Sequence, residues 1–221
     1  MSHAERTSTE RTQHLADQEI VNAVTHGVGC LLSVGGTVYV GTMVVKLDFG
    51  LAASCLVYTS TLIAVYAIST VSHAVQRPRA KFLLRTWDQG VVYLLIAGTY
   101  TPFAWSGLEE TSRFILFVLL WGCAMTGFIS KVVRHHRVNE FSALGYIMLG
   151  WIPTIVLFST ISTECFWWMA AGGMSYTVGT LFLTFDNRVR YFHAIWHLFV
   201  IAASACHYYA VVTFIILPRM N

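Results

Sequence analysis

Charged side chains are scarce in this chain: 11% of its 221 residues are Asp, Glu, Lys or Arg, whereas 56% are hydrophobic. Soluble domains carry about 25% charged residues. The shortage of charge therefore excludes an ordinary soluble domain and predicts an all-α integral membrane protein. The net charge of +3 is small and scattered along the chain, so nucleic acid is not an expected partner.

Closely spaced cysteines are absent as well. The five cysteines lie singly in different apolar stretches and form no Cys-x-x-Cys pair: Cys30, Cys55, Cys123, Cys165 and Cys206. This spacing excludes a zinc knuckle and a local disulfide framework. We interpret the cysteines as small hydrophobic packing residues.

The first 18 residues contain neither an apolar core nor a small-residue cleavage site, as a signal peptide would. We predict a cytosolic tail over residues 1–18 and a single membrane domain over residues 19–221. The length of that domain suits about seven helices of roughly 20 apolar residues each. The expected helices cover about 20–45, 51–75, 87–105, 114–130, 141–160, 165–185 and 191–217, and a basic connection over 80–86 is expected on the membrane surface.

Lysine and arginine are distributed unevenly between the connections. Eleven of the 14 lie in the N-terminal tail and in the second-to-third, fourth-to-fifth and sixth-to-seventh connections. The other side has Lys46, Arg113 and Arg219. Because basic residues concentrate in cytosolic loops, we predict a cytosolic N-terminus and a C-terminus on the outer side. The chain is expected to be a multi-pass protein of the cell membrane, which is the inner membrane if the source is bacterial.

The last apolar run contains two histidines at helical spacing. His193 and His197 are four residues apart and therefore share one helix face, within a stretch from 191 to 218 that has no Asp, Glu, Lys or Arg. The predicted topology places both at the cytosolic end of the last helix. His73, near the end of the second helix, and Asp88, at the start of the third, fall at the same level. Ionisable groups at membrane depth mark candidate functional sites.

Three imidazoles, from His73, His193 and His197, match the ligand set of a catalytic zinc site, which keeps a fourth position open. Three roles are open to Asp88: a fourth ligand, a partner that orients a histidine, or the base that takes a proton from bound water. The plainer alternative is that each histidine is a hydrogen-bonding strut between helices. His207, about 15 Å further along the last helix, is interpreted as such a structural histidine.

Further polar residues fall at the same level. Ser69 lies one turn from His73 on the same face, and we predict that it hydrogen-bonds a substrate carbonyl or the bound water. Glu19, Asn22 and His26 belong to the first helix, where Asn22 and His26 share a face. We predict that these three residues form a supporting or proton-relay shell.

Together, these motifs resemble the hemolysin III family, the bacterial members of the group that includes the progestin and adipoQ receptors. In chain order they are Glu19-x-x-Asn22-x-x-x-His26, Ser69-x-x-x-His73, Trp87-Asp88, Gly98-Thr99-Tyr100-Thr101-Pro102 and His193-x-x-x-His197. The resemblance covers residues 17–217. It implies a seven-helix fold with the N-terminus inside and a zinc ion near the cytosolic face.

The same resemblance implies roles for individual residues. His73, His193 and His197 match the three histidines that bind zinc in the adiponectin receptors, and Asp88 matches a nearby aspartate there. Ser69 matches a serine of the wider superfamily of membrane hydrolases, which includes the alkaline ceramidases. The loops of this chain are too short for an extracellular ligand-binding domain, which disfavours a hormone-receptor role.

Two classes of function follow. The first is a zinc-dependent intramembrane hydrolase of a lipid amide or ester, in which Asp88 and Ser69 are catalytic and the setting is membrane homeostasis. The alternative is non-enzymatic: a hemolysin-like, cytolytic pore or channel, or a receptor-like membrane sensor with a structural zinc. Charged residues are nearly absent from the outer halves of the predicted helices, so a continuous ion path lacks its usual lining.

Overall fold

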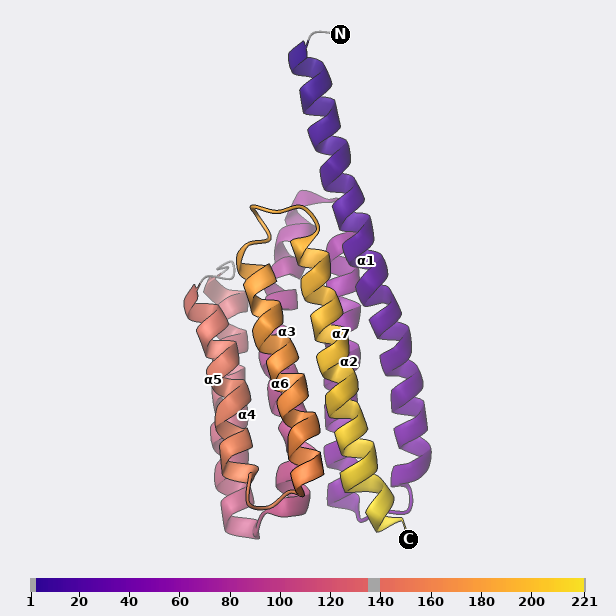
Figure 1. Ribbon diagram of the computed structural model, residues 1–221, viewed down its shortest axis with the longest axis vertical. Coiled ribbons are helices and arrows are strands. Elements are labelled where there is room, and N and C mark those ends of the chain that lie inside the picture. The colour runs from indigo at the N-terminus through magenta and orange to yellow at the C-terminus, as the bar shows by residue number, and fades with distance from the viewer. Residues whose placement is uncertain (1–2, 135–139, 221) are drawn as a thin grey trace.

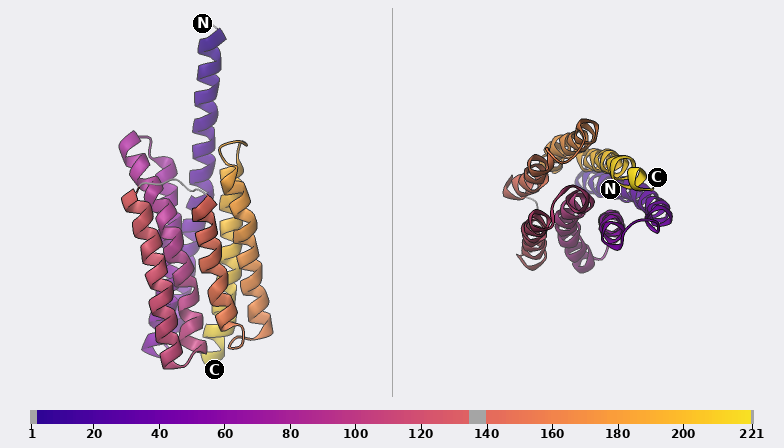
Figure 2. Two further views of the ribbon diagram at one scale, coloured as in Figure 1. Left: turned by 90° about the vertical axis from the view of Figure 1, so that its left-hand side faces the viewer. Right: turned by 90° about the horizontal axis from the view of Figure 1, so that it is seen from below.

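The computed structural model describes residues 3–134 and 140–220, and these residues contain helices and short turns but no strand. Seven α-helices run alongside one another in one bundle (Figures 1 and 2). After the last of them, the chain continues as a π-helix, Val211–Ile216, and a 3₁₀ turn, Leu217–Arg219. The α-helices are α1 His3–Val44, α2 Phe49–Ala74, α3 Pro78–Gly107, α4 Glu110–Arg134, α5 Glu140–Leu157, α6 Thr163–Thr184 and α7 Phe192–Ala210.

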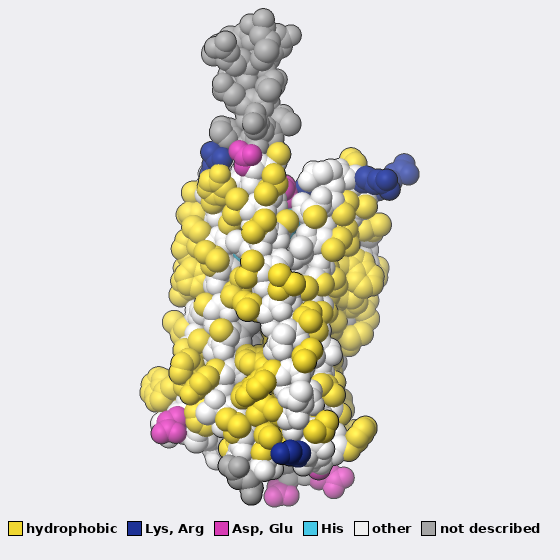
Figure 3. All heavy atoms as spheres, turned by 90° about the vertical axis from the view of Figure 1, so that its right-hand side faces the viewer, with side chains coloured by type: hydrophobic (Ala, Val, Ile, Leu, Met, Phe, Trp, Pro, Cys, Tyr) yellow, Lys and Arg dark blue, Asp and Glu magenta, His cyan; other side chains and the backbone are white. Residues whose placement is uncertain are grey.

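Four of the described helices are long and apolar enough to cross a membrane, over Ala16–Val44, Phe49–Ala74, Glu110–Val133 and Phe192–Arg219. Large hydrophobic side chains point outward from the bundle, as Leu31 and Phe114 do, at 75% and 67% exposed. Figure 3 shows hydrophobic side chains over the wall of the bundle and charged ones gathered at its two ends. An apolar wall about one bilayer long is the surface expected of a helical membrane protein.

Short polar residues and a proline set several of the helix ends. The Asp48 Oδ1 accepts a hydrogen bond from the Leu51 N–H at 3.0 Å, which begins α2. The Ser162 Oγ accepts one from the Cys165 N–H at 3.2 Å, which begins α6. Both are N-cap bonds that satisfy an otherwise unpaired backbone donor. Pro78 begins α3, at a position where a backbone N–H would have no acceptor within the helix, so its missing N–H costs no hydrogen bond.

Two helix starts differ from the expectations. Residues 80–86, expected as a connection ahead of the third helix, are the first turns of α3, because Pro78 starts the helix and nothing after it breaks the backbone hydrogen bonds. α1 begins at His3, so its backbone is helical through the segment expected as a tail up to residue 18. In Figure 1 α1 extends well beyond the other helices at its N-terminal end. Residues 135–139 of the predicted basic connection lie outside the described residues.

The second helix is central to the packing. α2 packs against α1 on one side and α3 on the other, α3 packs against α4, and α7 packs against α6 and α1. Large side chains fill the space between them, including the fully buried Tyr58, Phe103 and Val211. α1 thus lies against both α2 and α7, which brings distant parts of the sequence together.

The segment Gly98-Thr99-Tyr100-Thr101-Pro102 connects three helices. The Tyr100 hydroxyl of α3 bonds to the Gly150 carbonyl and to the Thr154 Oγ1 of α5. The Trp121 Nε1–H of α4 donates to the Thr101 Oγ1 at 3.3 Å. This motif is therefore a structural connector, and the candidate site is formed by other residues.

Gly98 allows α3 to approach α2 closely, and replacing it by alanine is expected to destabilise the bundle. An added Cβ would lie 2.3 Å from the Thr61 Oγ1 and 2.9 Å from its Cγ2, on a β-branched side chain that has little freedom to move. We expect Gly98→Ala to cost about 1–3 kcal/mol of unfolding free energy, measured by denaturation in detergent.

Gly35→Ala is the matched control, because no atom lies within 4 Å of its added Cβ. The higher helix propensity of alanine should leave that variant neutral or stabilised by up to about 1 kcal/mol. Equal behaviour of the two variants would contradict the close α2–α3 contact.

Candidate metal centre

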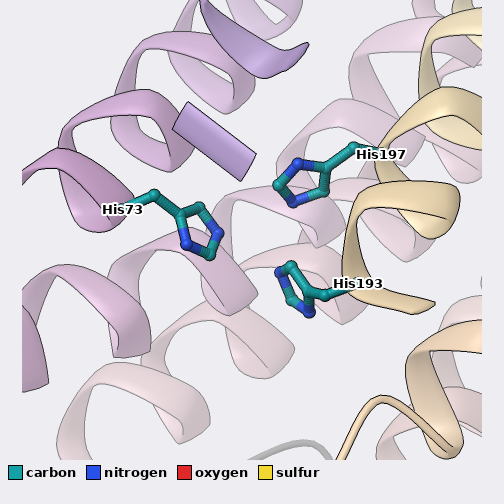
Figure 4. A group of neighbouring side chains, drawn as sticks. All are labelled: His73, His193 and His197. Atoms are coloured by element: carbon teal, nitrogen blue, oxygen red, sulfur yellow. The ribbon is translucent and has the colours of Figure 1, made fainter. Parts of the chain in front are cut away.

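Three histidines from two helices converge at one end of the bundle. His73 comes from α2, and His193 and His197 come from the first two turns of α7. One ring nitrogen from each lies within 4.8 Å of the others, and Figure 4 shows the three rings facing a common centre. The ring centroids are 5.0 Å apart for His73 and His193, 5.1 Å for His73 and His197, and 4.6 Å for His193 and His197.

Two of the histidines donate their Nδ1–H to a carboxylate. His73 bonds to the Oε2 of Glu19 on α1 at 2.9 Å. His193 bonds to the Oδ2 of Asp186, in the connection before α7, at 2.8 Å. A carboxylate that accepts the Nδ1–H fixes the tautomer of the ring and leaves the Nε2 lone pair unprotonated.

The third histidine has a neutral partner. The Nδ1 of His197 lies 3.1 Å from the Oγ1 of Thr25 on α1. The Thr25 hydroxyl also bonds to the backbone carbonyls of Val21 and Asn22, each at 2.9 Å. Since a hydroxyl has one proton to donate, it gives that proton to a carbonyl and accepts the Nδ1–H of His197. The Nε2 of His197 therefore keeps its lone pair too.

This arrangement fits a metal ion with three imidazole ligands. All three rings have the Nδ1 occupied by a partner from another element and the Nε2 available as a ligand. The Nε2 of His73 is buried and has no hydrogen-bond partner among the described residues. A buried polar atom without a partner costs free energy, and a metal ion at the centre of the triad would remove that cost.

A cavity of about 320 Å³ opens beside the histidines. Its wall includes Asp88 of α3, whose Oδ2 accepts a hydrogen bond from the Ser72 Oγ at 3.3 Å. Ser69, also in the wall, is completely buried, and its Oγ makes no well-aligned hydrogen bond to any of the described residues. Among the described residues, Asp88 makes no hydrogen bond to a histidine, and its carboxylate does not belong to the group of close ligand atoms. Asp88 and Ser69 thus face the cavity beside the triad.

Glu19 links the triad to the start of α3. While its Oε2 accepts from His73, its Oε1 accepts from the Arg85 Nη2 at 2.5 Å and lies 3.3 Å from the Lys81 Nζ. The carboxylate is thus bonded on both oxygens and held by residues of two helices. Such anchoring restricts the orientation of His73.

The two other residues predicted for the supporting shell also line the cavity. Asn22 and His26 are 6% and 3% exposed. The His26 ring stacks on His197, with centroids 3.5 Å apart and planes at 15°. Neither ring nitrogen of His26 has a hydrogen-bond partner among the described residues. His26 therefore packs against a triad ring and leaves polar atoms unpaired beside the cavity.

His207 lies outside this group. It is buried further along α7, and its Nε2–H donates to the Met169 carbonyl of α6 at 3.1 Å. An added Cβ on Gly172 would lie 2.4 Å from that Nε2. The contacts of His207 are those of a strut between α6 and α7.

Sequence reasoning missed Thr25 and Asp186. Thr25 is three residues from Asn22, so helical spacing would have placed it beside the predicted shell. Asp186 belongs to the polar connection between the sixth and seventh predicted helices, and no periodic pattern relates it to His193. Its role depends on the path of the chain between α6 and α7.

Comparison with known proteins gives a consistent result over nearly the whole chain. A family model described as "Haemolysin-III related" matches residues 15–208. The chain is 34% identical over 200 residues to "Hemolysin-3 homolog" of Bacillus subtilis, covering 88% of this chain and 92% of the relative. It is 33% identical over 217 residues to "Hemolysin-3" of Bacillus cereus, covering 96% and 97%. The human "Monocyte to macrophage differentiation factor" is 32% identical over 164 residues, covering 70% and 67%.

Proposed function

Because the chain belongs to the haemolysin III-related family of membrane proteins, we propose that it binds a zinc ion through His73, His193 and His197 and hydrolyses an amide or ester bond of a lipid. The observation that supports this most strongly is the common state of the three rings. Each has its Nδ1–H bonded to a partner, which leaves three Nε2 lone pairs for one ion. Three imidazoles with room for a further group are the ligand set of catalytic rather than structural zinc.

Zinc at such a site supplies a Lewis acid that polarises a carbonyl and makes water more acidic. Asp88 is the proton carrier in this proposal: it accepts a proton from the attacking water and passes it to the leaving group. The Ser72 hydroxyl holds the Asp88 carboxylate in place. The Ser69 Oγ, buried and without a partner at the cavity wall, donates a hydrogen bond to the carbonyl oxygen of the substrate.

The shape of the cavity supports a lipid as the substrate. A second cavity of about 50 Å³ shares five lining residues with the main one: Val92, Leu95, Tyr146, Tyr176 and Trp196. The side chains around the smaller cavity are mostly apolar and come from α3, α5 and α6, with Trp196 of α7. A reactive group beside the triad would therefore have apolar surface next to it for part of an acyl chain.

We further propose that all seven helices cross the cell membrane, with the N-terminus in the cytosol and the C-terminus outside. α3, α5 and α6 run alongside the four apolar spans in the same bundle (Figure 1). Of the 13 lysines and arginines among the described residues, ten belong to helix ends and connections on the side of the bundle that carries the triad, which agrees with the preference of basic residues for the cytosol. The candidate site then lies near the cytosolic face.

The hydrolase proposal is tested with purified protein in lipid vesicles. A panel of lipid amides and matched esters is incubated with it, and released fatty acid is measured. We expect release from at least one class, loss of release after metal chelation, and recovery on adding zinc. Release that is insensitive to the chelator would contradict zinc-dependent hydrolysis.

The same preparation tests the non-enzymatic alternative of a pore or channel. The interior at the end away from the triad is packed with buried apolar side chains, among them Val40, Leu51 and Ile215. Such packing offers no polar lining for ions, so we expect no single-channel currents with or without chelator. Zinc-dependent currents without hydrolysis would favour a channel or sensor with a structural zinc.

A further inference from the structure

The first turns of α3 carry a stripe of basic residues that the proposed chemistry does not use. Lys81 and Arg85 are four residues apart and share a face of the helix, and Arg77, the N-cap residue, lies one turn before Lys81. We call Arg77, Lys81 and Arg85 the basic stripe. Residues 77–87 contain no acidic side chain, and Asp88, the next residue of α3, hydrogen-bonds to Ser72 and forms no ion pair with the stripe.

The neutralisation from neighbouring helices is incomplete. Among the described residues, Glu19 is the one acidic residue that forms ion pairs with the stripe, through Lys81 and Arg85. The same carboxylate also accepts from His73, so its negative charge is shared. Three cations against one shared carboxylate leave a net positive surface, which is complementary to an anion.

The stripe leads to the cavity of the metal centre. Arg85 lines that cavity, and its side chain is 39% exposed, whereas His197 is 1% exposed. Arg85 therefore lies towards the opening. A guanidinium has five N–H donors in a rigid fork, and among the described residues Arg85 makes one hydrogen bond, to Glu19. Donors remain for a planar or tetrahedral anion such as a phosphate.

The surroundings of the stripe are those of a membrane interface. Phe82, next to Lys81, is 52% exposed, and Leu83 and Trp87, on the other side of the same turns of α3, are 49% and 44% exposed. Exposed apolar and tryptophan side chains next to basic ones are typical of segments at the level of lipid headgroups. An anion that meets the stripe at this depth would carry an acyl chain along the neighbouring apolar surface.

We propose that the basic stripe is a binding site for the headgroup of an anionic phospholipid at the opening of the cavity. The phosphate bonds to Arg85 and Arg77, and the lipid chain lies against the outer, apolar side of α3. Zinc and hydrolysis are not needed for this contact, because the stripe lies outside the triad.

Native mass spectrometry of the purified protein in mixed micelles tests the proposal. The micelles contain equal amounts of phosphatidylglycerol and phosphatidylcholine, and retained lipid is counted for wild type, Arg77→Gln and Arg85→Gln. We expect wild type to retain phosphatidylglycerol preferentially, and each variant to lose about fivefold in that preference, which is the usual effect of one basic residue near anionic lipid.

Arg79→Gln is the matched control. It removes the same charge from the same turn, but Arg79 is two residues from Lys81 and so lies on the opposite side of the helix. We expect its preference to stay within about twofold of wild type. An equal loss in Arg79→Gln, or no preference in wild type, would overturn the proposal.

Two further measurements separate the possible outcomes. Free glycerol phosphate is added as a competitor. If it displaces the lipid completely, the stripe binds a soluble anion, and this result would contradict a lipid site. Zinc content is measured in every sample. Loss of lipid preference at unchanged zinc content is the result expected of Arg77→Gln, because Arg85→Gln also removes a partner of Glu19 and should weaken zinc binding. Absence of zinc from wild type would contradict the proposed function and leave the lipid measurement interpretable.

Discussion

Purified His193→Ala protein is expected to contain at least about tenfold less zinc than wild type after dialysis against a weak chelator. The remaining two imidazoles cannot complete a three-ligand site, and no other group of three ligand residues in the described chain is close enough to replace it. His193 suits this test because its side chain is 25% exposed. Its truncation therefore leaves no large internal cavity, and the fold should survive. Metal content per mole of protein is measured by mass spectrometry.

Two variants control this experiment. His207→Ala removes a buried histidine from the same helix whose partner is the Met169 carbonyl, so we expect it to keep its zinc. Glu19→Gln keeps the ligands but weakens the acceptor of the His73 Nδ1–H, and we expect about 10–100-fold weaker zinc binding. Equal zinc in wild type and His193→Ala would show that the triad is not the metal site.

Asp88→Asn is expected to hydrolyse lipid about 10²–10⁴-fold more slowly than wild type while keeping its zinc. The substrate for this test is the lipid whose hydrolysis by wild type is lost on metal chelation. Asparagine has the shape of aspartate but cannot carry a proton. Its amide still pairs with the Ser72 hydroxyl, which holds the carboxylate in the native chain, so the position of the side chain should change little. Turnover and zinc content are measured on the same preparation.

Asp48→Asn is the control, because it makes the same chemical change at the end of α2 that is far from the triad. Asp48 is the N-cap of that helix, and asparagine caps equally well, so we expect normal turnover. The zinc content and turnover of Asp88→Asn also decide between the roles open to Asp88. Loss of zinc in Asp88→Asn would make it a ligand, and retained turnover would exclude it as the proton carrier.

The periodicity of the sequence was sufficient to find most of the site. His193 and His197 follow helical spacing, and the bias of basic residues placed His73 and Asp88 at their level although they are more than 100 residues away. The structure brings the three histidines together and puts Asp88 in the wall of the adjoining cavity. Depth along a bundle axis can be deduced from sequence, because helix length and loop charge are local properties.

The partners of the histidines could not be predicted in the same way. The sequence predicts a supporting role for Glu19 but not its contacts. One carboxylate oxygen bonds to His73, and the other contacts Arg85 and Lys81. These contacts depend on the packing of α1, α2 and α3. The assignment of Asp186 to His193 depends on the turn before α7. Rotation of each helix about its own axis decides these contacts, and side-chain packing sets that rotation.

By itself, the sequence determined that this protein is helical, is built for a lipid environment and has the residues of its candidate site at one end of the bundle. Those properties follow from composition, from runs of apolar residues and from charge in the connections. Only the tertiary structure decided that α3 begins at Pro78, that three Nδ1–H groups are bonded so that three Nε2 atoms remain, and that Asp88 lies beside the triad as part of the cavity wall. These features rest on contacts between residues far apart in the chain, which no local pattern encodes.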